Sequence, residues 1–236
     1  MTDKKTIVVT GASRGLGLAL VHRAVALGWN VVACSRGRPT DLPAGVNHVP
    51  LDLASESSVL AAAAEILTIA PSIDVVVNNA ALNNNSAEVG GGQRQGSAST
   101  LPFEGMSTFF TVNATAPIVF AGKLLTALKA SERGLVINVS SIRGSIAEIS
   151  DEKIRYGYGA SKAALNHLTR TLAFECKPSG IRVVAVHPGW MRTDLGGPSA
   201  PLDPSTIANA LLALHATLPT ETSGGFIDHE GRSLRW

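Results

Sequence analysis

Residues 6–17 read TIVVTGASRGLG, an apolar run of mostly β-branched residues followed by a glycine-rich turn. The run is typical of a buried β-strand, and the segment rich in alanine and leucine at 15–28 is typical of a helix. Glycines let the backbone turn tightly and approach an anion, while the free N–H groups at the start of a helix favour negative charge. The stretch therefore predicts an α/β fold with a phosphate-binding turn after its first strand.

The same alternation of strand and helix continues along the chain. Further apolar runs are NVVACS, VNHVP, IDVVVNNA, LVINVSS and IRVVAVHP, and helical stretches lie at 55–70, 105–129, 157–177 and 204–218. Because the runs are continuously apolar, helices are expected to cover both faces of the strands. We predict a doubly wound, mostly parallel Rossmann-type sheet of about seven strands with helices on both faces, within one domain spanning residues 1–236.

One segment interrupts this rhythm. Residues 82–102, LNNNSAEVGGGQRQGSASTLP, are rich in Asn, Gly and Ser and have no usable periodicity, which predicts a flexible insertion. Ligands of such sheets bind beyond the carboxyl ends of the strands, so this insertion would overhang the crevice. A lid over the ligand and a tolerated surface insertion both remain open.

Composition limits the functional classes. The 236 residues are 45% hydrophobic and 16% charged, with a net charge of +2 and scattered basic residues, so nucleic-acid binding is not indicated. No apolar stretch reaches the roughly 18 residues of a membrane helix, and the N-terminus lacks the features of a signal peptide, so we expect a cytoplasmic protein.

Metal binding is not indicated either. The six histidines are dispersed, and the two cysteines, Cys34 and Cys176, do not form a Cys-x-x-Cys pair. We expect buried thiols and no metal site.

The glycine turn has a distinctive spacing. The turn reads Thr10-Gly11-Ala12-Ser13-Arg14-Gly15-Leu16-Gly17, which is G-x-x-x-G-x-G rather than the more common G-x-G-x-x-G. By itself it could be a simple strand-to-helix turn. Placed on the first strand, it resembles the cofactor turn of the short-chain dehydrogenase/reductase family. The resemblance implies that the cofactor contacts Gly11, Ser13, Arg14, Gly15, Leu16 and Gly17.

The second strand indicates which dinucleotide is bound. NAD sites usually place an acid at the end of this strand to hold the ribose 2′-hydroxyl, whereas NADP sites use an arginine for the 2′-phosphate. No acidic residue lies between Leu18 and Thr40, and Arg36 follows NVVACS, with Arg38 nearby. Arg36 and Arg14 could fork around one phosphate. NADPH is therefore the expected cofactor.

Two further cofactor contacts are implied by the resemblance. Asp52, followed by Leu53, resembles the family's contact with the adenine amino group. The segment from Asn78 through Asn79 and Ala80 to Ala81 resembles the family's Asn-Asn-Ala-Gly turn, with Ala81 in place of the usual glycine. Ordinary turn chemistry at a strand end is the alternative interpretation of both.

Tyr158 and Lys162 are the candidate acid/base pair. Four residues apart on a predicted helix, they project from one face. A phenol has a pKa near 10, so acid/base work at neutral pH needs a nearby cation such as this ammonium. Tyr156 is a weaker candidate because Ala160 stands four residues after it.

Ser141 and Asn113 complete the expected catalytic set. Ser141 ends the LVINVSS strand, where its hydroxyl can donate a hydrogen bond to a carbonyl oxygen as charge develops, and Ser140 is the alternative for this role. Asn113 resembles the family asparagine that supports a water beside the lysine in a proton relay.

The last motif follows the strand IRVVAVHP. Pro188, Gly189 and Thr193 resemble the family segment that holds the nicotinamide carboxamide, and we interpret the preceding His187 as structural. The resemblance spans the whole chain, with the motifs in the family's order, and is greatest to the C-factor-like carbonyl reductase branch. Two intervals, 82–102 and Ser141 to Tyr158, are longer than usual, so the substrate cannot be inherited from relatives.

The function expected from the resemblance is hydride transfer between NADPH and a small carbonyl or alcohol substrate. Two alternatives remain: an NADP-sensing signalling or regulatory protein with little catalysis, and an epimerase or dehydratase, which usually needs a further substrate domain. Many relatives assemble through their long helices, so a homodimer or homotetramer is expected. The sequence leaves open the substrate, the stereochemistry and the direction of reaction.

Overall fold

The computed structural model describes residues 4–84, 86–89, 98–150 and 156–236. Seven strands form one sheet in the order β3-β2-β1-β4-β5-β6-β7, and all neighbouring pairs are parallel. Their bounds are β1 Thr6–Thr10, β2 Asn30–Ser35, β3 Asn47–Pro50, β4 Val75–Asn78, β5 Leu135–Val139, β6 Arg182–His187 and β7 Phe226–Asp228. The predicted doubly wound parallel sheet is confirmed. Six strands lie on the apolar runs, whereas the short β7 had no predicted run.

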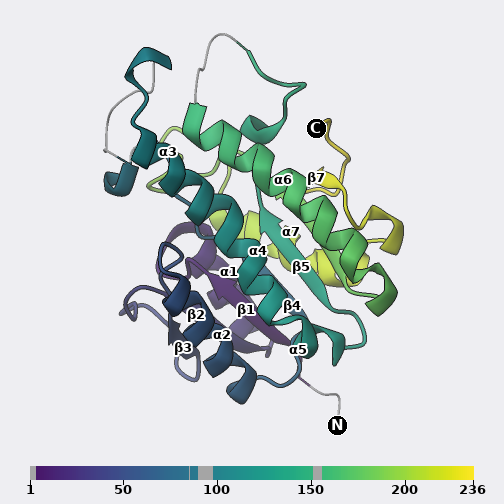
Figure 1. The fold of residues 1–236 in the computed structure, drawn as a ribbon. Helices are drawn as coiled ribbons and strands as arrows, with labels where there is room; N and C mark the ends of the chain where they lie inside the picture. The colour runs from purple at the N-terminus through teal and green to yellow at the C-terminus, as the bar shows by residue number, and fades with distance from the viewer. Residues whose placement is uncertain (1–3, 85, 90–97, 151–155) are drawn as a thin grey trace.

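Helices cover both faces of the sheet (Figure 1). On one face lie α1 (Gly15–Ala26) and α7 (Pro204–Thr217), and on the other lie α2 (Glu56–Ile69), α4 (Ala116–Lys123) and α6 (Tyr156–Cys176). Successive residues of β1 point to opposite faces and are fully buried on both, which explains why its sequence is continuously apolar. In the described ranges, no helix is long and apolar enough to cross a membrane.

The helical stretch predicted at 105–129 is confirmed, but it is not one regular helix. The segment forms α3 (Phe103–Phe110), a π-helical turn at Thr111–Thr115, then α4 and a short α5 (Leu125–Lys129). Pro117 has no N–H, so it cannot donate the usual hydrogen bond to the carbonyl of Asn113, four residues earlier. The backbone N–H of Ala116 bonds to the carbonyl of Thr111, the wider spacing of a π-turn. The break therefore lies at the predicted functional asparagine.

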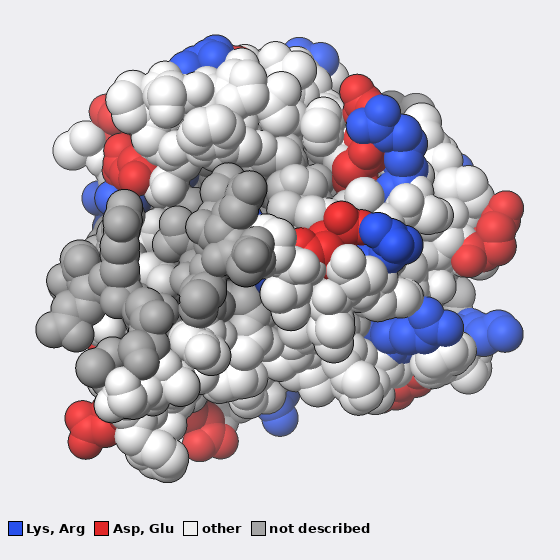
Figure 2. Space-filling view, turned by 90° about the horizontal axis from the view of Figure 1, so that it is seen from above, with Lys and Arg blue, Asp and Glu red and all other residues white. Residues whose placement is uncertain are grey.

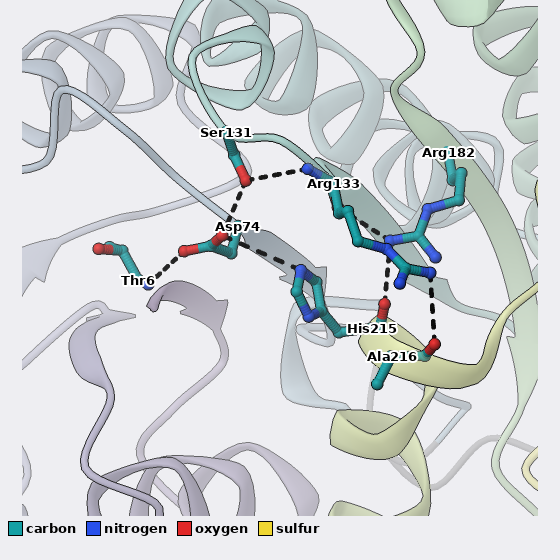
Figure 3. Close-up of polar contacts among 7 residues, drawn as sticks. All are labelled: Thr6, Asp74, Ser131, Arg133, Arg182, His215 and Ala216. Carbon is teal, nitrogen blue, oxygen red and sulfur yellow. Dashed lines mark hydrogen bonds and ion pairs between the residues drawn. The ribbon is translucent and has the colours of Figure 1, made fainter. Parts of the chain in front are cut away.

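The edge where the strands begin is held by buried polar contacts (Figure 3). The carboxylate of Asp74, just before β4, accepts hydrogen bonds from the backbone N–H of Thr6 and from the hydroxyl of Ser131, both at 2.7 Å. Arg182, at the start of β6, donates to the carbonyls of Arg133, His215 and Leu218. The last two carbonyls belong to the end of α7, where backbone acceptors need partners. These contacts tie α7 to the sheet at the edge opposite the carboxyl ends of the strands.

His215 makes this edge sensitive to acid. Its side chain is 5% exposed, and Nε2 lies 4.0 Å from the Asp74 carboxylate. Burial, opposed by Asp74 but reinforced by Lys5, Arg182 and Arg133, lowers the pKa of His215 from 6.5 to about 4. The folded state therefore keeps this imidazole neutral while the unfolded chain takes up a proton, so its contribution to stability is complete above pH 6.5 and is lost as the pH falls toward 4.

We expect His215→Leu to weaken the acid sensitivity of folding. In the wild type, this group should account for a loss of about 2–3 kcal/mol between pH 7 and pH 4. Urea unfolding of both proteins across this range measures the difference, with His167→Gln, at an exposed position of α6, as the control. An unchanged pH dependence in His215→Leu would exclude this role.

Candidate active site

The strand order reverses beside β1, which pairs with β2 on one side and with β4 on the other. In open α/β sheets, ligands bind beyond the carboxyl ends of the strands at such a point. Figure 2 views the molecule from this end, and basic and acidic side chains are interspersed on the visible face. The residues that follow β1, β2, β4, β5 and β6 therefore define the candidate site.

The glycine turn after β1 depends on the absence of side chains. Gly11 and Gly15 have φ values of 66° and 54°, in the left-handed region that favours glycine. A Cβ atom on Gly17 would collide with the carbonyl oxygen of Gly11 and lie 2.7 Å from Nδ2 of Asn79. The turn and the first turn of α1 are thus packed too closely to admit even alanine at position 17.

Asn79 and Thr10 hold this turn against the end of β4. The hydroxyl of Thr10 accepts hydrogen bonds from the backbone N–H groups of Asn79 and Ala80, at 3.0 and 3.2 Å. Nδ2 of Asn79 donates to the carbonyls of Thr10 and Gly11, at 2.9 and 3.2 Å. The side chain predicted to contact the cofactor therefore shapes the turn that would surround it.

The start of α1 lies directly after the glycine turn, at the carboxyl end of β1. The N-cap residue Arg14 makes no side-chain capping bond, and the first turn of α1 carries no acid. The side chain of Leu16 is buried in the core on the α1 face, so Leu16 can offer a ligand only its backbone. Ser13 is exposed at the same turn. Such a helix start suits the oxygens of a pyrophosphate.

The two arginines predicted to bind one phosphate each contact a carboxylate. Arg14 lies 2.8 Å from Asp194, which follows β6, and Arg36 lies 2.8 Å from Glu88, in the short 3₁₀ turn Ala87–Val89. Sequence reasoning missed Glu88 because it falls in the aperiodic insertion, of which residues 85 and 90–97 lie outside the described residues. The end of β2 has no acidic residue of its own, but Glu88 from a distant segment places a carboxylate there.

Asp52 and Leu53 lie at the end of β3, as predicted. Oδ1 of Asp52 accepts a hydrogen bond from the backbone N–H of Ala54 at 3.0 Å, which fixes the turn before α2. The Leu53 side chain is buried in the core. This is the strand-end turn chemistry that the sequence allowed, and a contact between Asp52 and an adenine stays a prediction.

Tyr158 and Lys162 lie together in the first turns of α6. Nζ of Lys162 is 5.9 Å from the centre of the Tyr158 ring and donates a hydrogen bond to the carbonyl of Val139, at the end of β5. The lysine is only 2% exposed, and burial lowers its pKa to about 7. The charge of Lys162 is therefore sensitive at neutral pH to any anion or hydroxyl that binds beside it.

The two serines after β5 have different partners. The Ser140 hydroxyl donates its proton to Oδ1 of Asn166 on α6, so that proton is used within the helix–sheet contact. Ser141 accepts a hydrogen bond from the backbone N–H of Arg143 at 3.1 Å, which leaves its hydroxyl proton available for donation. This difference favours Ser141 over Ser140 as the substrate-facing donor.

Asn113 joins three parts of the site. Its Oδ1 accepts from the backbone N–H of Leu82, and its Nδ2 donates to the carbonyl of Leu82 and to the hydroxyl of Ser161. The fully buried amide thereby fixes the segment after β4 to α6, one residue before Lys162. A role in a proton relay stays a prediction, since these contacts occupy its side chain.

The segment after β6 packs against the glycine turn. The Thr193 methyl group would lie 3.2 Å from a Cβ atom placed on Gly15, so the two segments touch. Gly189, with φ of 86°, allows the chain to turn after Pro188. His187 is partly buried, and desolvation lowers its pKa to about 4, so it is neutral at physiological pH.

Comparison with known proteins identifies the fold family. Residues 5–201 match the family model described as short chain dehydrogenase. The chain belongs to this family. The predicted family is confirmed by this match, which includes the glycine turn and the Tyr158–Lys162 pair.

Individual relatives extend the likeness over nearly the full chain. C-signal from Myxococcus xanthus is 32% identical over 70% of this chain and 93% of its own length. The NADPH-bound carbonyl reductase from chicken fatty liver is 28% identical, with a TM-score of 0.85 over 99% of both chains. An oxidoreductase from Brucella ovis in complex with a partially ordered NAD is 32% identical, with a TM-score of 0.78 over 96% of this chain and 99% of its own. The chain is thus related to the C-factor and carbonyl reductase branch of the family.

Proposed function

We propose that this protein is an NADPH-dependent carbonyl reductase in which Tyr158 is the proton donor. The observation that carries the proposal is the buried Nζ of Lys162 beside the Tyr158 ring, at the carboxyl end of β5 where a substrate would lie. The relation to a carbonyl reductase that binds NADPH supports it.

The residues at the carboxyl ends of the strands fit a dinucleotide. The uncapped start of α1 offers N–H groups to a pyrophosphate, and the missing Cβ at Gly17 keeps the turn close to the helix. Arg36 would hold the 2′-phosphate, Pro188, Gly189 and Thr193 the carboxamide, and Lys162 the nicotinamide ribose. When bound, NADPH supplies the hydride.

Four side chains have separate roles in the proposed reaction. The Ser141 hydroxyl donates a hydrogen bond to the substrate carbonyl oxygen and fixes its position. Tyr158 donates its phenolic proton to the same oxygen as the carbonyl carbon is reduced, which completes the alcohol. The ammonium of Lys162 stabilises the phenolate that remains on Tyr158. Asn113 holds the start of α6, which carries Tyr158 and Lys162, through its hydrogen bond to the Ser161 hydroxyl.

Cofactor preference is tested by Arg36→Ala. Loss of a charge-assisted contact with the 2′-phosphate should weaken NADPH binding about 10- to 100-fold, while NADH binding should change little. Fluorescence titration of both cofactors measures this, and Arg38→Ala, two residues along the same loop, is the matched control. An equal loss of affinity for NADPH and NADH would show that Arg36 does not act through the 2′-phosphate.

Two alternatives are separated by one screen. Some support for a signalling role comes from the relation to C-signal, a protein named for a signal. We expect this chain to consume NADPH, followed by absorbance, with aldehydes, ketones or quinones. Tight NADPH binding without consumption across the panel would favour the sensor. Conversion of added nucleotide sugars without net NADPH consumption, followed by chromatography, would favour an epimerase or dehydratase.

The proposal also includes the localisation, the partners and the oligomeric state of the protein. We expect the chain to act as one catalytic domain in the cytoplasm, on small molecules and without nucleic acid or membrane partners. We also expect a homodimer or homotetramer, which light scattering of the purified protein would resolve.

A further inference from the structure

Glu88 is an anion placed at the position where the cofactor's extra phosphate is expected. Its Oε1 lies 2.8 Å from a terminal nitrogen of Arg36, the residue proposed to hold the 2′-phosphate. The carboxylate reaches this place from the segment after β4, far in sequence from β2. Any phosphate bound by the same guanidinium would therefore have a carboxylate as its neighbour.

The position of Glu88 is fixed by its surroundings. The next residue, Val89, is 6% exposed, and its backbone N–H donates to the carbonyl of Ser86. Oγ of Ser86 in turn accepts a hydrogen bond from the backbone N–H of Asn83 at 2.9 Å. These contacts hold the 3₁₀ turn that carries Glu88.

Glu88 carries its negative charge at neutral pH. A hydrogen bond from its own backbone N–H and the guanidinium of Arg36 keep the pKa of Glu88 below its usual value, and Arg14 acts in the same direction. Both arginines expected at the phosphate therefore act on this carboxylate. Bound NADPH would place its negatively charged 2′-phosphate close to the negatively charged Glu88 carboxylate, near the same two arginines. NADH carries only an uncharged hydroxyl at this position.

We propose that Glu88 sets the cofactor selectivity of this site by opposing the 2′-phosphate of NADPH at Arg36. The inference rests on the proposed function, because it takes Arg36 as the phosphate-binding residue. The segment that the sequence left as a lid or a tolerated insertion acquires a role in cofactor choice.

The test compares cofactor binding in Glu88→Gln and the wild type. We expect the dissociation constant of NADPH to fall about 5- to 20-fold in the variant at low ionic strength, while that of NADH changes less than about twofold. Since Arg36 and Glu88 are partly exposed, with side-chain exposures of 68% and 36%, the gain should largely disappear at about 1 M salt. Glu104→Gln, on the exposed start of the neighbouring α3, is the matched control and should change neither constant.

Three results would bear against a role of Glu88 in cofactor selectivity or against the proposed function. Unchanged or weaker NADPH binding in Glu88→Gln, or an equal change for NADH, would overturn the inference. In the background of Arg36→Ala, Glu88→Gln should have a much smaller effect on NADPH, and an undiminished effect would also overturn it. If the wild type binds neither cofactor, the proposed function itself fails, which is a distinct result.

Discussion

Tyr158→Phe is expected to reduce kcat for carbonyl reduction by about 10³-fold or more, with the NADPH dissociation constant nearly unchanged. The variant lacks only the hydroxyl that would donate the proton, while the ring keeps its place 5.9 Å from Nζ of Lys162. Steady-state kinetics and cofactor titration of the same preparation separate the two effects.

The control for this variant lies two residues away. Tyr156, in the same turn of α6, is 39% exposed, and its position four residues on is Ala160 rather than a lysine. Tyr156→Phe should retain wild-type kcat. Retained turnover in Tyr158→Phe, or a comparable loss in Tyr156→Phe, would remove Tyr158 from the proposed role.

Gly17→Ala is expected to weaken NADPH binding at least about 100-fold, equivalent to about 3 kcal/mol. The new Cβ would collide with the carbonyl oxygen of Gly11 and approach Nδ2 of Asn79 to 2.7 Å, and these atoms hold the turn against β4. Neither atom can yield without opening the turn, so the N–H groups of α1 would no longer converge on the pyrophosphate.

Gly122→Ala provides the matched control. Gly122 lies in α4, and a Cβ there meets nothing within 4 Å, so helix propensity alone should make the variant up to about 1 kcal/mol more stable. Thermal unfolding of both variants, with and without NADPH, measures folding and binding separately. A folded Gly17→Ala protein with wild-type affinity would contradict the proposed turn geometry.

The parallel sheet and the order of the motifs were predictable because each depends on local sequence. Runs such as Thr6–Thr10 are buried on both faces, and the glycine turn needs special backbone angles that few residues adopt. The break at Asn113 could also have been found, since Pro117 removes the hydrogen bond that would have continued the helix.

Other features depend on contacts between distant segments. Glu88 reaches Arg36, and Asp194 reaches Arg14, across separations of 52 and 180 residues that no periodic pattern reveals. The choice between Ser140 and Ser141 required the position of Asn166, 26 residues beyond Ser140. The short β7 is flanked by turns and has too few residues for a strand pattern.

The most direct test of the central claim follows the hydride itself. NADPH deuterated at the transferred position is incubated with the protein and each aldehyde or ketone that it reduces, and the product is examined by mass spectrometry and NMR. We predict deuterium on the carbinol carbon with the wild type and almost none with Tyr158→Phe. Oxidation of NADPH with no deuterium in the alcohol, or equal transfer by Tyr158→Phe, would contradict the account.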